Sequence, residues 1–288
     1  IPHPSALIPG SAALAADYPS RPVRVLIPFT PGSAADIIAR AMEPAMRDRL
    51  GQPFVIDNRG GAGGNIAAEM TAKAAPDGYT IMMATIGTHA INYSLYSKLN
   101  FHPQRDFTPV GLVGESPNAL VINPKVQANS IQELIALAKA KPGQLNYGTS
   151  GAGTTVHLSA ELFSVMTGIK MIHVPYKGAA EALSSLLGGQ TDLMFASLSS
   201  AIPLIKAGRL RAFAVTGAQR SPSLPELPTV AEAANLPGYA ASAWFGIVGP
   251  AHMPANAVAT LSKTALSSLE DAEVRKRLFN AGVEIRTS

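Results

Sequence analysis

Two glycine-rich loops carry the residues that could do chemistry, with the sequences FTPGS at 29–33 and GTSGAGTT at 148–155. Each loop follows an apolar, strand-like run and precedes a helix-like run. Glycine lets the backbone approach a ligand closely, and a helix start offers free N–H groups and the positive end of its dipole. Neither loop contains lysine or arginine. Each is therefore a candidate anion cradle of amides and hydroxyls, which suits a carboxylate better than a triphosphate.

Nucleotide binding is disfavoured at both candidate motifs. The glycine spacing of the second loop fits a phosphate-binding loop, but Thr154 stands where that motif needs its lysine. The GAGG run at 61–64 lacks the third glycine of the dinucleotide fingerprint and does not follow a strand end.

A serine hydrolase is the alternative function. The sequence GTSGA at 148–152 departs from the nucleophile elbow only at its last position, and Asp192 and His252 follow Ser150 in the required order. A triad is recognised by geometry, however, so one near match with loosely spaced partners is weak support. We expect a binding protein and assign no catalytic residue.

Composition limits the classes of protein and partner. A chain of 288 residues predicts two lobes, and a net charge of +4 from scattered lysines and arginines argues against nucleic acid. The absence of cysteine excludes disulfides and thiolate sites, and the histidines show no metal-ligand spacing. We therefore expect neither metal nor cofactor. No apolar run approaches the about 20 residues that cross a bilayer.

Residues 1–17 are expected to be a signal-peptide remnant or a flexible tail. They end in SAALAAD, in which Ala13 and Ala15 match the small-residue pattern of a cleavage site. Folding is expected to begin near Tyr18.

Alternating strand and helix patterns predict an α/β fold. In the first half the pattern gives strands at 23–29, 54–57 and 79–85 and helices at 34–50 and 65–75. After the capping box SIQE at 130–133 the scheme repeats, with strands at 145–147, 171–174 and 191–196 and helices at 156–166 and 179–187. Pro254 is expected to start one long C-terminal helix. Each lobe should be a mainly parallel sheet flanked by helices.

Ligands of such sheets bind beyond the carboxyl ends of the strands, which adds Thr85, Thr88 and Ser197 to the candidates. Residues 18–118 and 222–288 are assigned to lobe 1, and 119–221 to lobe 2. If both lobes present these ends to each other, the ligand lies in a cleft that closes by hinge motion.

A series of ordered motifs resembles the Bug receptors, the solute-binding proteins of tripartite tricarboxylate transporters. The motifs are IPFTPGS at 27–33, DNR at 57–59 before GAGGN, PDGY at 76–79, GAGT at 151–154 and HVPYKG at 173–178. The resemblance runs from Tyr18 almost to the C-terminus. It implies a two-lobed periplasmic binding protein of the type II plan that closes on a small carboxylate and delivers it to membrane permease subunits. We expect a monomer.

The candidate ligand-binding residues come from the cradles, the strand ends and the aromatic residues near them. They are Phe29, Pro31, Gly32, Ser33, Thr85, Thr88, Ser150, Gly151, Gly153, Thr154, Thr155, His157, Tyr176, Phe195 and Ser197.

Several roles stay open at this point. His157 is either a packing residue at a helix start or a neutral donor, and Tyr176 and Phe195 are either cleft or core residues. Valine at Gly32 or Gly153 is expected to abolish binding by filling the ligand's place. The acid itself is left open among aliphatic di- and tricarboxylates, acidic amino acids and aromatic acids, as is a signalling output in place of transport.

Overall fold

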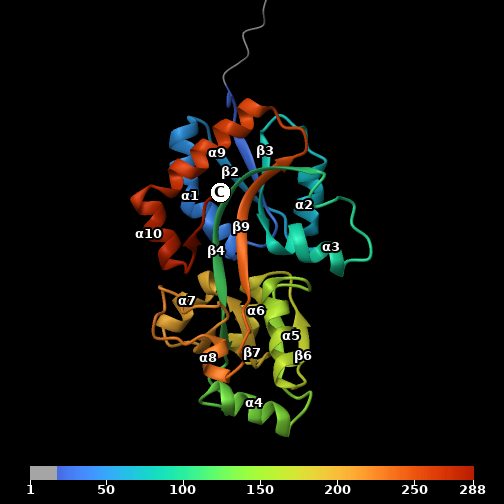
Figure 1. Cartoon of the computed structure of the whole chain (residues 1–288), viewed down its shortest axis with the longest axis vertical. Helices are drawn as coiled ribbons and strands as arrows, with labels where there is room; N and C mark the ends of the chain where they lie inside the picture. The colour runs from blue at the N-terminus through green and yellow to red at the C-terminus, as the bar shows by residue number, and fades with distance from the viewer. Residues whose placement is uncertain (1–17) are drawn as a thin grey trace, which may run out of the picture.

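In the computed structural model, which describes residues 18–288, the chain forms two lobes joined by a pair of long antiparallel strands (Figure 1). The strands are β1 (Val23–Ile27), β2 (Phe54–Asn58), β3 (Thr80–Thr85), β4 (Phe107–Ile122), β5 (Asn146–Thr149), β6 (Ile172–Pro175), β7 (Leu193–Ser197), β8 (Arg211–Val215), β9 (Ser242–Pro250) and β10 (Glu284–Ile285). The helices are α1 (Ala34–Leu50), α2 (Asn65–Ala72), α3 (Asn92–Leu95), α4 (Ile131–Ala140), α5 (Thr155–Thr167), α6 (Ala179–Gly188), α7 (Leu198–Lys206), α8 (Val230–Ala234), α9 (Ala255–Leu269) and α10 (Ala272–Asn280), with short helical turns η1 (Ala62–Gly64) and η2 (Gly87–Ile91). The expectations for residues 1–17 lie outside the described residues.

The first lobe contains the sheet order β2-β1-β3-β9-β4. Strands β1, β2 and β3 are parallel, whereas β9 is antiparallel to both β3 and β4. Helices α1 and α9 cover one face, where Ile38, Met42 and Leu261 are fully or almost fully buried, and α2 packs against the other face. Burial on both faces explains why β3, and β1 apart from Arg24, consist mainly of apolar residues.

The second lobe continues from β4 in the order β4-β7-β5-β6, with β8 also paired to β4. Its β5, β6 and β7 are parallel, and β4 is antiparallel to β7 and β8. Phe163 and Phe195 lie in contact in the core of this lobe. The predicted α/β architecture, two lobes with mainly parallel sheets flanked by helices, is thus present, with the antiparallel β4–β9 pair as the addition.

Local signals explain where the helices at the lobe junction begin and end. Ser33 caps α1 and Thr154 caps α5, each through a side-chain oxygen that accepts from a backbone N–H three residues on. Gly51 and Gly168 end these helices in the left-handed conformation that glycine adopts without strain.

One predicted helix differs from the structure, and the packing of one segment bears on where the lobes divide. The long C-terminal helix is broken into α9 and α10, because Asp271 caps a new start by accepting from the N–H groups of Glu273 and Val274. Within residues 222–241, assigned from sequence to lobe 1, Val230 and Tyr239 lie in the core of the second lobe, and the Tyr239 hydroxyl donates to the Ser159 carbonyl. We therefore propose that the chain returns to lobe 1 through β9.

Candidate functional site

A small cavity of about 40 Å³ lies between the lobes. Both lobes contribute to its wall, which is formed by Phe29, Ser33, Ala34, Ala35, Thr85, Ile86, Gly87, Ser150, Thr154, Thr155, Val156, Ala179, Ser197, Ala243 and Phe245. Acidic and basic side chains are absent from this set. Any charge on a ligand here must be balanced by backbone groups and hydroxyls.

Helix N-termini converge on this wall from both lobes. Ala34 is the first residue of α1, Thr155 the first of α5 and Ala179 the first of α6, and Ser197 directly precedes α7. The first N–H groups of a helix have no partner within it, and the aligned peptide dipoles give this end a partial positive charge. These helix ends therefore contribute partial positive charge to the cavity, and the described residues place no cationic side chain in its wall.

Capping leaves a defined set of N–H groups free. Ser33 Oγ accepts from Asp36 N at 3.4 Å, and Thr154 Oγ1 accepts from His157 N at 3.3 Å. Among the hydrogen bonds of residues 18–288, none uses the N–H groups of the cavity-lining residues Ala34, Ala35, Thr155 and Val156.

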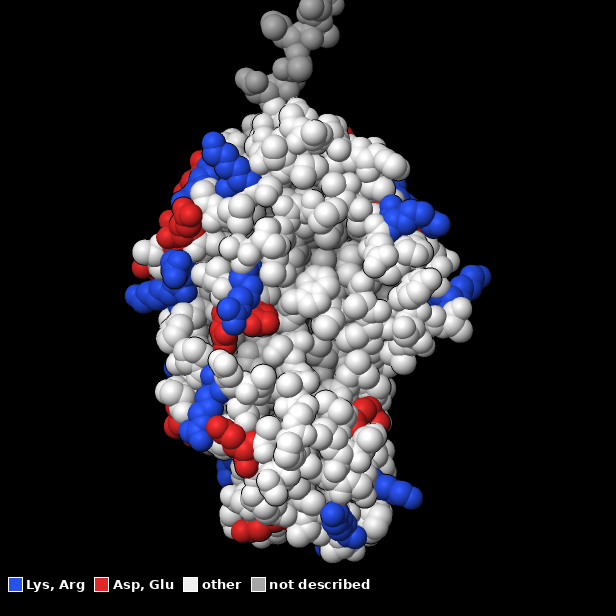
Figure 2. All heavy atoms as spheres, in the orientation of Figure 1, with Lys and Arg blue, Asp and Glu red and all other residues white. Residues whose placement is uncertain are grey.

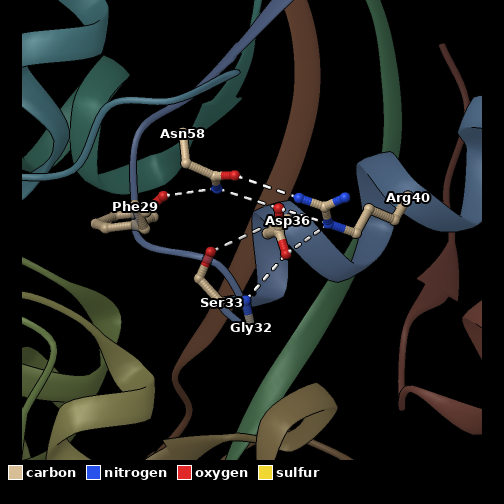
Figure 3. Close-up of polar contacts among 6 residues, drawn as sticks. All are labelled: Phe29, Gly32, Ser33, Asp36, Arg40 and Asn58. Atoms are coloured by element: carbon tan, nitrogen blue, oxygen red, sulfur yellow. Dashed lines mark hydrogen bonds and ion pairs between the residues drawn. The ribbon is translucent and has the colours of Figure 1, made fainter. Parts of the chain in front are cut away.

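A buried carboxylate organises the first loop (Figure 3). Asp36 Oδ2 accepts from Gly32 N at 2.9 Å, and both Asp36 oxygens lie 3.0 Å from Arg40 Nε. Asn58 Nδ2 donates to Asp36 Oδ1 and to the carbonyl of Phe29. The Gly32 N–H is thereby occupied, so Gly32 does not offer a ligand donor. Asp36 faces its own loop and not the cavity wall.

Hydroxyls add further polar groups to the wall. No hydrogen bond of the described residues involves the side-chain oxygens of Ser150, Thr155 and Ser197, so these three are free to meet a ligand. Thr154 Oγ1, in contrast, donates to the Gly151 carbonyl at 2.8 Å and is fully engaged.

The structure brings some of the predicted residues together and separates others. The candidates in the cavity wall are Phe29, Ser33, Thr85, Ser150, Thr154, Thr155 and Ser197. The candidates outside it are Pro31, Gly32, Thr88, Gly151, Gly153, His157, Tyr176 and Phe195.

Two of the outlying candidates support the site from within their lobes. Thr88 is fully buried and binds the Thr85 backbone, with Oγ1 accepting from Thr85 N at 3.1 Å. Phe195 is fully buried in the core of the second lobe. Sequence position at a strand end does not show on which side of the sheet a side chain lies.

Gly151 and Tyr176 line an outer chamber of about 370 Å³ that also lies between the lobes. Phe29 and Ser150 line both this chamber and the inner cavity, so the two spaces are adjacent at these residues. Lys177 and Glu181 bring one charge of each sign to the outer chamber.

Gly153 and its neighbour touch the first lobe directly. A Cβ atom on Gly153 would lie 2.6 Å from Asn92 Oδ1 and 2.7 Å from Leu95 Cδ2, both of α3. The Tyr96 hydroxyl donates to the Ala152 carbonyl at 3.4 Å. The lobes are thus in contact beside the cavity, as in a closed receptor.

His157 lies behind the second loop and not in the cavity wall. Its ring stacks on His173 with centroids 4.3 Å apart, and His173 stacks on Tyr147 at 5.1 Å. His157 Nδ1 accepts from Gly153 N at 3.3 Å. Burial lowers the pKa of His157, and Glu161 partly offsets this shift.

Eight further residues line the cavity without having been predicted from sequence: Ala34, Ala35, Ile86, Gly87, Val156, Ala179, Ala243 and Phe245. Ala34 and Ala35 follow the helix cap Ser33, and Val156 lies two residues after the cap Thr154, so a cap-type residue ahead of a helical pattern is a signal that could have identified them. Ala243 and Phe245 lie on β9, with Trp244 between them on the other face of the strand. Their place in the wall depends on β9 pairing with β3, which no local pattern reveals.

The proposed hydrolase triad does not assemble. Asp192 Oδ2 accepts from Asn146 N at the start of β5, the opposite end of that strand from Ser150. His252 follows the far end of β9, beyond Pro250, whereas the cavity residues lie at the start of that strand.

The described residues contain no group of His, Asp or Glu side chains suited to a metal ion and no helix able to span a membrane. On the face drawn in Figure 2, basic and acidic side chains are spread in small mixed groups.

Comparisons with known proteins show which family the chain belongs to. Residues 38–288 match the family model of the tripartite tricarboxylate transporter family receptor. BugT of Bordetella pertussis is 36% identical over 266 residues, which is 92% of this chain and 81% of that protein. A solved R. palustris protein with adipate shares 40% identity at a TM-score of 0.91, covering 93% of this chain and 90% of that one. MatC from Rhodopseudomonas palustris with bound malate shares 34% identity at a TM-score of 0.88, covering 93% and 91%. The chain therefore belongs to the tripartite tricarboxylate transporter receptor family, as a solute receptor related to the Bug proteins.

Proposed function

We propose that this receptor binds a small carboxylate in the cavity between its lobes and delivers it, in the periplasm, to the membrane subunits of a tripartite tricarboxylate transporter. The observation that carries the proposal is the convergence of helix N-termini from both lobes on a cavity whose wall has no charged side chain. Relatives solved with adipate and with malate support this ligand class.

Backbone donors are sufficient for useful affinity. A hydrogen bond to a charged acceptor contributes about 1.5–3 kcal/mol, and a micromolar complex needs about 8 kcal/mol. The free N–H groups of Ala34, Ala35, Thr155 and Val156 together with three free hydroxyls can supply this after ordering costs.

The size of the cavity indicates how the acid lies. A water molecule needs roughly 10–15 Å³ of the space that the centre of a water-sized sphere can reach. The cavity offers about 40 Å³ of this space, so it holds little more than a carboxylate and its neighbouring carbon. We propose that the rest of the acid extends past Phe29 and Ser150 into the outer chamber.

We also propose that binding involves no turnover. Ser150 is the residue that a hydrolase would use, and no histidine forms a hydrogen bond with its hydroxyl among the described residues. Without a general base the hydroxyl stays a weak nucleophile.

The test removes one N–H from the cavity wall. Proline is favoured at the first position of a helix, and Ser33 before Ala34 already has the extended backbone that a following proline requires. Ala34→Pro should therefore keep α1 but weaken binding of adipate or malate by roughly 10-fold or more, since one charge-assisted hydrogen bond is lost.

Ala272→Pro is the matched control, at the first position of α10 on the surface. Calorimetry should show unchanged affinity for this variant. A thermal-shift screen of di- and tricarboxylates, acidic amino acids and aromatic acids should raise the Tm of the unmodified protein with the logarithm of acid concentration. A Tm that no acid raises would contradict the proposed function.

A further inference from the structure

The loop of the second lobe that touches the first lobe beside the cavity, residues 150–155, is held by a histidine. Gly153 contacts Asn92 and Leu95 of the first lobe, and its N–H donates to His157 Nδ1. This bond requires an unprotonated Nδ1, so the ring is neutral with its proton on Nε2. Nε2 in turn lies 4.0 Å from Glu161 Oε1.

We propose that His157 is a positioning residue whose neutral ring holds residues 150–155 in the shape that the closed receptor needs, and that its protonation opens the receptor and releases the ligand. The release of ligand rests on the function proposed above. The role in shaping the loop does not.

Protonation turns the hydrogen bond between Gly153 N–H and His157 Nδ1 into a repulsive contact. A charged imidazole carries a proton on both nitrogens, so Nδ1 would face the Gly153 N–H with a second donor. The loop must then move, and Gly153 moves with it away from α3. Because the free hydroxyls of Ser150 and Thr155 in the same loop line the cavity, the same movement disturbs the ligand's donors.

The surroundings of His157 keep it neutral when the lobes are in contact. The titratable groups that face it are Tyr147 on β5, His173 on β6, Glu161 on α5 and, beside Gly153, Tyr96 of the first lobe. Burial lowers the pKa of His157. Burial also lowers the pKa of His173, and the neighbouring His157 lowers it further. The Glu161 carboxylate, which also accepts from the Tyr147 hydroxyl, favours the charged form of His157. The effect of burial on the His157 pKa is larger than that of Glu161.

The direction of the pH effect follows from linkage. Burial lowers the pKa of His157 in this structure, and the proposal requires that separation of the lobes reduces this burial, so that the open receptor binds a proton more readily. Affinity should therefore be fully present above the ordinary imidazole pKa of about 6.5 and fall as the pH drops below it. The loss levels off below the lowered pKa of the closed state.

The first test compares pH profiles of adipate affinity by calorimetry between pH 8 and pH 5. Adipate itself titrates in this range, so the informative quantity is the difference between the unmodified protein and His157→Asn, whose side-chain oxygen can accept from Gly153 but does not titrate. The unmodified protein should lose about tenfold more affinity than the variant for each pH unit that separates the His157 pKa of the two states. His252→Asn, which removes an exposed histidine beyond β9, should follow the unmodified protein. Parallel profiles for the unmodified protein and His157→Asn would overturn the proposal.

The second test uses the unmodified protein without ligand and so does not depend on the proposed function. Nuclear magnetic resonance of histidine nitrogens should show the Nε2-protonated form of His157, and the Gly153 amide should titrate with the same midpoint. A proton on Nδ1 of His157, or a Gly153 amide signal that does not change with pH at the His157 midpoint, would overturn the role of His157. If no acid binds, the proposed function fails, and this experiment still decides on His157.

Discussion

Glycines of the two binding loops share a backbone conformation but differ in what they face. Gly32 has φ +81° and Gly153 has φ +80°, both in the left-handed region. A Cβ on Gly32 would meet open space, whereas one on Gly153 would collide with Asn92 and Leu95. Both glycines were predicted from sequence to contact the ligand. They could not be told apart, because the difference lies in contacts with the opposing lobe.

Alanine at each position separates strain from collision. Both Gly32→Ala and Gly153→Ala should lower the free energy of unfolding by about 1–2 kcal/mol, since a side chain is strained in the left-handed region. Only Gly153→Ala should also weaken binding of adipate, because its methyl group keeps the lobes apart. Urea unfolding and calorimetry measure the two effects. Equal losses of affinity in both variants would show that the collision is irrelevant.

At the scale of elements, helix starts are the features that local sequence predicts best, in the site and outside it. Ser33, Thr154 and the Thr229–Glu232 capping box act as caps in the structure, because capping depends on residues three apart. Which N–H groups stay free was not predictable. Asp36 binds the Gly32 N–H with help from Asn58 of β2, a contact between residues 22 apart in sequence.

The buried carboxylate should be essential to the start of α1. Asp36→Asn removes a charge that is 3% exposed and paired with Arg40, and we expect a loss of about 1.5–3 kcal/mol in the free energy of unfolding. Asp77→Asn breaks the exposed ion pair with Arg21 and should cost about 0–1 kcal/mol. Chemical denaturation of both variants checks the difference, and a similar cost for the two would refute the assigned role of Asp36.

At the scale of the whole molecule, the lobes and their parallel strands followed from local periodicity. The parts that rest on distant contacts did not. Examples are the insertion of β9 between β3 and β4, and the packing of α8 with the second lobe. The cavity residues Ala179, Ala243 and Phe245 are in the same class, because apolar side chains give no local sign of facing a gap between lobes.

Closure of the whole molecule should depend on a second contact, between Thr30 and Gly178. Gly178 has an extended backbone that any residue adopts, but a Cβ there would lie 2.9 Å from Thr30 Cβ across the lobes. Gly178→Ala should therefore hold the lobes apart, and small-angle scattering with saturating adipate should show a larger radius of gyration than for the unmodified protein.

Gly188→Ala is the control, because a side chain there meets nothing within 4 Å. Adding Thr30→Gly to Gly178→Ala removes the obstructing side chain and should restore the compact form. Failure of this double variant to become compact would mean that the two residues do not act on each other.

The strand that joins the lobes also carries the chain's single tryptophan, Trp244. It is partly buried on the face of β9 opposite Ala243 and Phe245, which line the cavity. Any bending of β9 as the lobes separate alters the surroundings of this indole. Its intrinsic fluorescence is thus a built-in optical reporter, and rapid mixing with an acid gives the rate of closure without attaching a dye.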